Sequence, residues 1–153
     1  MELLRKVASF GTSMDEKKNI YILYVRSILE QSCVVWHSSL TKENICDLER
    51  IQKNAVRIIM GRNYNDYEDA LEIIGLQSLE KRRNELCLRF AKNCVRNEKT
   101  SNMFPVNNKK HDMNTRKEEK FKVKHANTGR LKNSVIPTMQ RMLNEDYRKN
   151  AYK

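Results

Sequence analysis

The sequence predicts an all-α fold, an irregular bundle of four to five helices with a basic, largely disordered C-terminal tail. Glycine and proline are scarce, with 4 and 2 residues among 153, whereas antiparallel β-folds need turn residues at short intervals. Apolar residues recur at three- and four-residue steps, which is the pattern of an amphipathic helix. Helix-capping signals stand between these stretches and divide the chain into its predicted helices.

The first two predicted helices are separated by Gly11. A short helix over residues 2–10 is expected to turn inward Leu3, Leu4 and Val7. The letters SMDE form a capping box, in which Ser13 and Glu16 bind each other's backbone N–H groups, and begin a helix that runs to about Gln31. The predicted inward face of this helix consists of Ile20, Leu23, Tyr24 and Ile28.

The next predicted helix covers residues 41–60, with Thr41 as its N-cap and Gly61 at its C-terminal end. Trp36 precedes it in an apolar stretch and is expected in the core, as is Tyr24, although both rings could also stack on bases. The inward face of the 41–60 helix is predicted to hold Leu48, Ile51, Ala55, Ile58 and Ile59. The opposite face holds Arg50, Lys53, Asn54 and Arg57.

Two further helices complete the predicted body. The first is capped by Asn65, closed by Glu68 and ended by Gly75, and Ser78 caps the second, which covers residues 79–97. The inward residues of the second helix are expected to be Leu79, Leu86, Cys87, Phe90, Ala91 and Cys94. Its outward face carries three arginines at seven-residue steps, close to two helical turns, and these are Arg82, Arg89 and Arg96.

The charge is distributed unevenly along the chain. Residues 1–97 hold 16 basic and 13 acidic side chains, a net charge of +3, whereas residues 98–153 hold 14 and 6, a net charge of +8. We therefore expect a helical domain over 1–97, a basic disordered segment over 98–133, and a short helix with the C-terminus over 134–153. The middle segment has too few apolar residues to offset the entropy of ordering it.

The sequence indicates no catalytic site, cofactor site or metal site. Cys33 and His37 are four residues apart and could form a nucleophile–base pair or two metal ligands, but a buried structural cysteine is the favoured interpretation. No glycine-rich phosphate loop occurs in the chain. We therefore expect a protein that is not itself an enzyme.

The sequence favours an intracellular protein, cytoplasmic or nuclear, without a membrane association. The N-terminus has charged residues but no apolar signal segment, and no stretch of about 18 apolar residues exists to span a bilayer. The four cysteines form no closely spaced pair and are expected to be reduced.

The net charge of +11 favours a polyanionic partner, with nucleic acid as the main candidate and an anionic membrane surface as the lesser one. The basic side chains that step by three or four residues along two helices form the first two candidate sets, and the tail lysines form a third. Such side chains would bind phosphates and produce salt-dependent affinity, although a simply solvated face is the alternative for each helix. The candidate binding residues are Arg50, Lys53, Arg57, Arg82, Arg83, Arg89, Lys92, Arg96, Lys120, Lys122 and Lys124.

Four phrases of the sequence resemble one family. YILYVRSILEQSCVVW, LERIQKNAVRII, LEIIGLQSLEKRR and SVIPTMQRMLN occur in this order. Together they resemble the region after the polymerase palm in reverse transcriptases of non-LTR retrotransposons, the jockey-like and LINE-like elements. The resemblance covers residues 1–97 and, more loosely, 134–144. Arg82 and Arg83 match the family's LE-x-RR element, Trp36 matches its aromatic anchor, and Val34 stands where many relatives have proline.

The resemblance implies a thumb-like helical domain that helps to hold RNA or an RNA–DNA hybrid. The palm with its Asp-Asp motif and the family's cysteine–histidine knuckle are not in this sequence. We therefore expect a thumb and C-terminal fragment that binds nucleic-acid backbone, with the missing polymerase subdomains as further partners. A helical protein-interaction module and a degenerate retrotransposon remnant are the alternatives, and exposed apolar faces would favour association.

Overall fold

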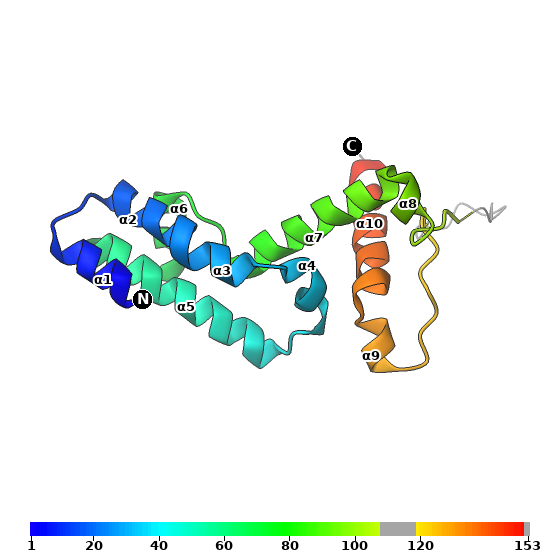
Figure 1. Ribbon diagram of the computed structural model, residues 1–153, viewed down its shortest axis with the longest axis horizontal. Coiled ribbons are helices and arrows are strands. Elements are labelled where there is room, and N and C mark those ends of the chain that lie inside the picture. The colour runs from blue at the N-terminus through cyan, green and yellow to red at the C-terminus, as the bar shows by residue number, and fades with distance from the viewer. Residues whose placement is uncertain (108–118, 152–153) are drawn as a thin grey trace. The chain divides into compact units, whose positions relative to one another are not determined.

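A computed structural model describes residues 1–107 and 119–151 (Figure 1). The described residues are mainly helical and contain no strand, only an isolated antiparallel bridge between Val106 and Phe121. The prediction of an all-α fold is therefore confirmed. The chain divides into two compact units, and the division falls within a helix rather than at residue 97, where the sequence placed a domain boundary.

Unit 1 consists of residues 1–33 and 40–84. It begins with α1 (Glu2–Ser9) and a continuous helical stretch made of α2 (Met14–Ile20), η1 (Tyr21–Arg26) and α3 (Ser27–Glu30). These are followed by α5 (Lys42–Met60), the short turn η3 (Gly61–Asn63), α6 (Tyr67–Ile74) and the start of α7 (Leu79–Arg96). Helices α1, α2 and α6 contact α5 (Figure 1). The core between them includes Leu4, Tyr21, Val56, Ile59 and Leu71.

Most helix ends in unit 1 follow the sequence signals. Ser13 and Glu16 form the expected capping box, with distances of 2.8 and 3.2 Å, and Thr41 caps α5. Gly75 ends α6 in the left-handed conformation, with φ of 70°. The prediction for the start of α6 is wrong, because Asp66 and not Asn65 is the N-cap, and its carboxylate accepts a hydrogen bond from the N–H of Glu68.

The predicted inward face of the second helix is wrong for three of its four residues, and only Ile20 packs against the core. Leu23, Tyr24 and Ile28 are 65, 60 and 69% exposed, while Tyr21 is fully buried. Residues Tyr21–Arg26 form a π-helix, whose wider turn changes which side chains face α5. Burial of Tyr21 is also favoured because its hydroxyl donates to Gln52 Oε1 at 2.6 Å.

Unit 2 consists of residues 34–39 and 85–153. Its described elements are the end of α4 (Cys33–Trp36), η2 (His37–Ser39), the rest of α7, α8 (Glu98–Ser101), α9 (Gly129–Lys132) and α10 (Val135–Ala151). Ser78 caps α7 as predicted, by accepting from the N–H of Lys81 at 3.3 Å. The core of unit 2 is formed by Ala91, Phe104, Phe121, Met139 and Leu143.

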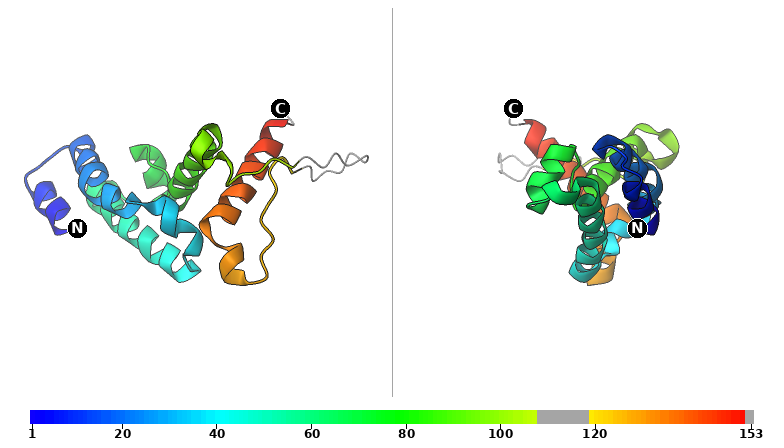
Figure 2. Two further views of the ribbon diagram at one scale, coloured as in Figure 1. Left: turned by 45° about the vertical axis from the view of Figure 1, so that its right-hand side comes forward. Right: turned by 90° about the vertical axis from the view of Figure 1, so that its left-hand side faces the viewer.

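The part of the predicted disordered segment that the structure describes is ordered in unit 2. Phe104 and Phe121 are only 3 and 6% exposed, and residues 119–126 run beside α10 (Figure 1 and Figure 2). The prediction of disorder is therefore wrong for 98–107 and 119–133, because these two aromatic side chains supply a core that the sequence pattern did not indicate. Residues 108–118 lie outside the described residues. The C-terminal helix is longer than expected and spans 17 residues.

Candidate nucleic-acid interface

Almost all of the excess positive charge belongs to unit 2. Counted over the whole sequence, unit 1 has 13 basic and 12 acidic residues, a net charge of +1. Unit 2 has 17 basic and 7 acidic residues, a net charge of +10. The eleven candidate residues are also divided. Unit 1 holds Arg50, Lys53, Arg57, Arg82 and Arg83, and unit 2 holds Arg89, Lys92, Arg96, Lys120, Lys122 and Lys124.

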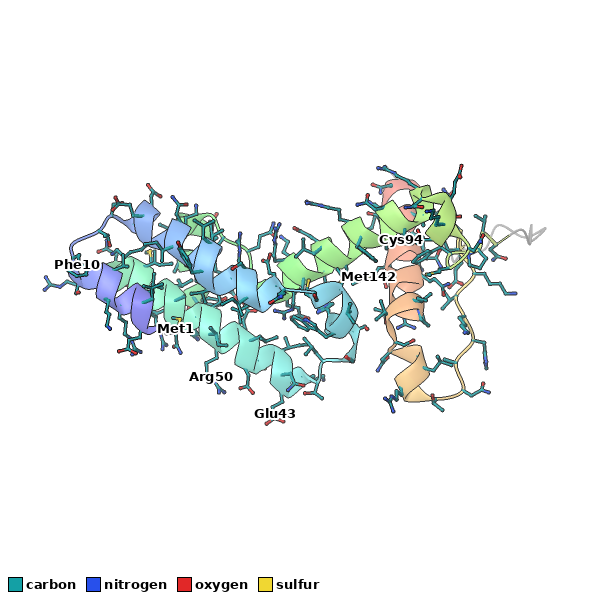
Figure 3. The ribbon with its side chains drawn as sticks, in the orientation of Figure 1. Met1, Phe10, Glu43, Arg50, Cys94 and Met142 are labelled. Carbon is teal, nitrogen blue, oxygen red and sulfur yellow. The ribbon has the colours of Figure 1, made fainter. Side chains whose placement is uncertain are left out.

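The basic face of α5 in unit 1 has local partners for each of its cations. Arg50 Nη1 lies 3.0 Å from Asp47 Oδ1, in an exposed pair. The Lys53 ammonium lies 5.8 Å from the ring centre of Tyr67, and the Arg57 guanidinium lies 5.3 Å from that of Tyr64. Figure 3 shows Arg50 and Glu43 projecting away from α5 on the same side. This face therefore combines both signs of charge.

The two arginines at the start of α7 are held within unit 1. Arg82 Nε lies 3.3 Å from Glu30 Oε1, and the same carboxylate lies 3.4 Å from Arg26. Arg83 is fully buried, with 0% exposure, so the expectation that it binds phosphate is wrong. The physical reason is its position four residues after Leu79, which places both side chains on the buried side of the helix.

In unit 2, α7 presents a row of cations to solvent. Arg89 and Arg96 are exposed and form no ion pair with any carboxylate of the described chain. Lys92 is between them in the sequence, and its Nζ lies 2.7 Å from Asp146 Oδ2 on α10. These side chains line a shallow groove of about 270 Å³ together with Leu88, Asn93 and one acidic residue, Glu85. The row resembles an anion-binding surface more closely than the α5 face does.

The tail lysines lie on an extended stretch, residues 119–126, which we call the lysine segment. Asn144 Oδ1 accepts from the N–H of Phe121 at 2.8 Å, and Asn144 Nδ2 donates to the carbonyl of Phe121 at 2.9 Å. Gln140 Oε1 accepts from the N–H of Lys124 at 2.9 Å. The Asn144 side chain thus makes with Phe121 the pair of hydrogen bonds that a neighbouring strand would make, so α10 holds the segment extended.

Gln140 and Asn144 are 2 and 1% exposed, and sequence reasoning missed both of them. A signal for them exists, because they are four residues apart and follow directly the buried Met139 and Leu143 on the same side of α10. Buried amide side chains need hydrogen-bonding partners. Their position therefore predicts hydrogen bonds to polar groups of another segment, although it does not identify which segment supplies them.

The lysines of this segment are presented in different ways. The Lys120 ammonium lies 4.9 Å from the ring centre of Tyr147 and 5.9 Å from that of Phe121, which fixes it over α10. Lys122 and Lys124 are exposed. They line a groove of about 590 Å³ together with residues that follow α8 and residues of α10.

The arrangement offers fixed cations rather than a reactive centre. In the described part of the chain no three His, Cys, Asp or Glu side chains gather as metal ligands. Among these same residues, no helix has the length and apolar character needed to cross a membrane. Cations on a helix and on a clamped extended segment are suited to phosphate oxygens, which accept hydrogen bonds from ammonium and guanidinium groups. Comparisons of the chain with protein-family models, curated proteins and solved structures find no match.

Proposed function

We propose that this protein binds the phosphate backbone of nucleic acid through unit 2. The observation that carries the proposal is the net charge of +10 on this unit, with Arg89 and Arg96 exposed on α7 and the lysine segment clamped to α10. Preordered cations lose less conformational entropy on binding than mobile ones. The ligand class is RNA or an RNA–DNA hybrid, which is what the resemblance to a retrotransposon reverse-transcriptase thumb implies.

Unit 1 takes a smaller part in this proposal than the sequence pattern suggested. Its net charge is +1, Arg82 is paired with Glu30, and Arg83 is buried. The pair of Arg50 with Asp47 is exposed, so a polyanion could still displace it. Unit 1 therefore supplies the matched control for the binding residues of unit 2.

The test is a fluorescence-anisotropy titration of labelled single-stranded RNA and of a labelled RNA–DNA hybrid at several salt concentrations. The unit 2 variant is R89Q/R96Q, and the control is R50Q/R57Q, which removes the same number of guanidinium groups from unit 1. Loss of two phosphate contacts should reduce the slope of log affinity against log salt by about 1.4 for a single strand. The control should leave the slope within experimental error of the parent protein.

Two results would reject the proposal. Binding that does not respond to salt would exclude a phosphate-based interface. An equal loss of slope in both double variants would place the contacts over the whole protein surface rather than in unit 2.

A helical protein-interaction module is the second candidate function. The observation that favours it is the exposed apolar side of α2, η1 and α3, where Leu23, Tyr24 and Ile28 face solvent. The same titration separates the two candidates, because this module alone predicts no salt-dependent binding of RNA. A Leu23→Ser/Ile28→Ser variant should leave RNA affinity unchanged if the phosphate interface is in unit 2.

A further inference from the structure

The groove beside the lysine segment combines an apolar lining with cations. Its volume is about 590 Å³, within the usual range for pockets that take small organic groups. Met103, Pro105, Val123 and Ile136 supply its apolar surface, and no acidic residue lines it. All of these residues belong to unit 2. The groove therefore suits a ligand that is both anionic and partly apolar.

Two lysines at the groove are held at a regular spacing. The N–H of Lys122 donates to the carbonyl of Pro105 at 2.9 Å, and the N–H of Lys124 donates to Gln140. Residues two apart on an extended chain lie about 6.6 Å from each other and point to the same side. This distance is of the same order as the separation of neighbouring phosphates along an extended nucleic-acid strand. Backbone hydrogen bonds thus hold in place the two chain positions that carry these lysines.

We propose that this groove receives an unpaired base of a single strand while Lys122 and Lys124 bind the flanking phosphates. The inference rests on the proposed function and specifies its substrate. A base within a duplex is stacked on both faces and paired at its edge, so it cannot enter the groove, whereas a single strand can turn a base outward. The exposed imidazole of His125 lines the same groove and offers a ring for stacking.

Base recognition at this groove should be tolerant of sequence. The amide of Gln140 is engaged on both sides, since its Oε1 accepts from Lys124 N–H and its Nε2 donates to the carbonyl of Met103 at 2.9 Å. Most of the remaining lining is apolar or cationic. Stacking and apolar contact are therefore expected to dominate over hydrogen bonds to base edges.

The test compares two labelled ligands of equal length at one salt concentration: an oligouridine strand and an abasic strand with the same phosphates. Because a stacked base adds to the affinity, the full-length protein should bind the uridine strand roughly tenfold more tightly than the abasic strand. His125→Ala should lower this ratio several-fold and leave affinity for the abasic strand unchanged. Asn127→Ala is the control, because Asn127 is exposed on the same connecting segment and does not line the groove.

A second measurement does not depend on any variant. A strand with 4-thiouridine, irradiated in complex with the protein, should crosslink to peptides within residues 102–105 or 122–140. Crosslinks confined to α7 would overturn the inference, as would equal affinity for the uridine and abasic strands. In both cases salt-dependent binding would remain and the proposed function would stand. If no ligand shows salt-dependent binding, the proposed function itself fails. Tighter binding of an acidic peptide than of the uridine strand would assign the groove to protein recognition and overturn the inference.

Discussion

Replacing Asn144 by alanine should release the lysine segment from α10. The side chain of Asn144 is 1% exposed and makes both of its hydrogen bonds to the backbone of Phe121. Alanine at this position leaves a buried N–H and a buried carbonyl without their partner. Each unsatisfied group costs about 1–3 kcal/mol, and partial access of water reduces the sum. We expect local destabilisation of about 2–4 kcal/mol.

Amide hydrogen exchange at Phe121 is the appropriate assay, because it reports the opening of this segment separately from the unfolding of unit 1. A loss of about 2–4 kcal/mol corresponds to exchange that is roughly 30 to 1,000 times faster. The amide of Lys124 should also exchange faster, since its acceptor Gln140 lies on the same helix. The amide of Ile59, in the core of unit 1, should not change.

Asn150→Ala is the matched control on α10. Asn150 is exposed, and its Nδ2 lies 3.3 Å from Asp146 Oδ2, so its loss should alter stability by no more than about 0.5 kcal/mol. Exchange at Phe121 that stays within about threefold of the parent protein in Asn144→Ala would refute the argument. Equal acceleration in the control would refute it as well, because the effect would then belong to the helix and not to the clamp.

Two further predictions concern unit 1. Arg83→Ala should lower the free energy of unfolding by about 2 kcal/mol or more in urea unfolding, because it removes a fully buried side chain. Lys81→Ala, on the exposed side of the helix, is the control and should have little effect. Neither variant should change the salt slope of RNA binding measured by anisotropy. Burial raises the pKa of Tyr21 above its ordinary value, and burial together with the Glu49 carboxylate raises the pKa of Tyr67. The unfolded chain loses these protons near pH 10, so the free energy of unfolding should fall as the pH rises above about 10. In urea unfolding at pH 9 to 11, Tyr67→Phe should show a shallower fall than the parent protein. Parallel plots of unfolding free energy against pH for the two proteins would contradict this.

The helix ends could be predicted from the sequence because their contacts are local. The capping box of Ser13 with Glu16, the Ser78 cap and the left-handed Gly75 each involve residues within a few positions of one another. Even here the detail differs, since the box of Thr41 is closed by Asn44, a residue that the usual pattern does not include. The N-cap of α6 was misplaced by one residue, where Asn65 and Asp66 are both good capping residues.

The faces of the helices could not be predicted with the same success because they depend on tertiary structure. A regular α-helical period placed Tyr24 in the core, but the π-helical stretch from Tyr21 to Arg26 buries Tyr21 instead. The seven-residue repeat of Arg82, Arg89 and Arg96 predicted the outer side of α7. Arg83 was added to the same candidate set beside Arg82, although adjacent helical residues point in directions about 100° apart and Arg83 is buried. Part of the candidate site was therefore predicted, and part of it was not.

The lysine segment shows why composition alone underestimated the order of residues 98–107 and 119–133. The lysines predict a solvated chain, and they are largely exposed here, as expected. Order comes from two buried phenylalanines and from Asn144 and Gln140, which lie 23 and 16 residues from the backbone groups they bind. Such pairs leave no periodic signal in a single sequence.

The distribution of acidic residues distinguishes the two units better than the distribution of basic ones. Both units are rich in lysine and arginine, with 13 such residues in unit 1 and 17 in unit 2. The 12 acidic residues of unit 1 can neutralise all but one of its cations, whereas the 7 acidic residues of unit 2 leave at least ten cations without a counter-charge in their own unit. Those remaining cations repel one another, and a polyanion relieves that repulsion on binding. A basic helix face is therefore weak evidence for nucleic-acid binding until the carboxylates folded beside it have been counted.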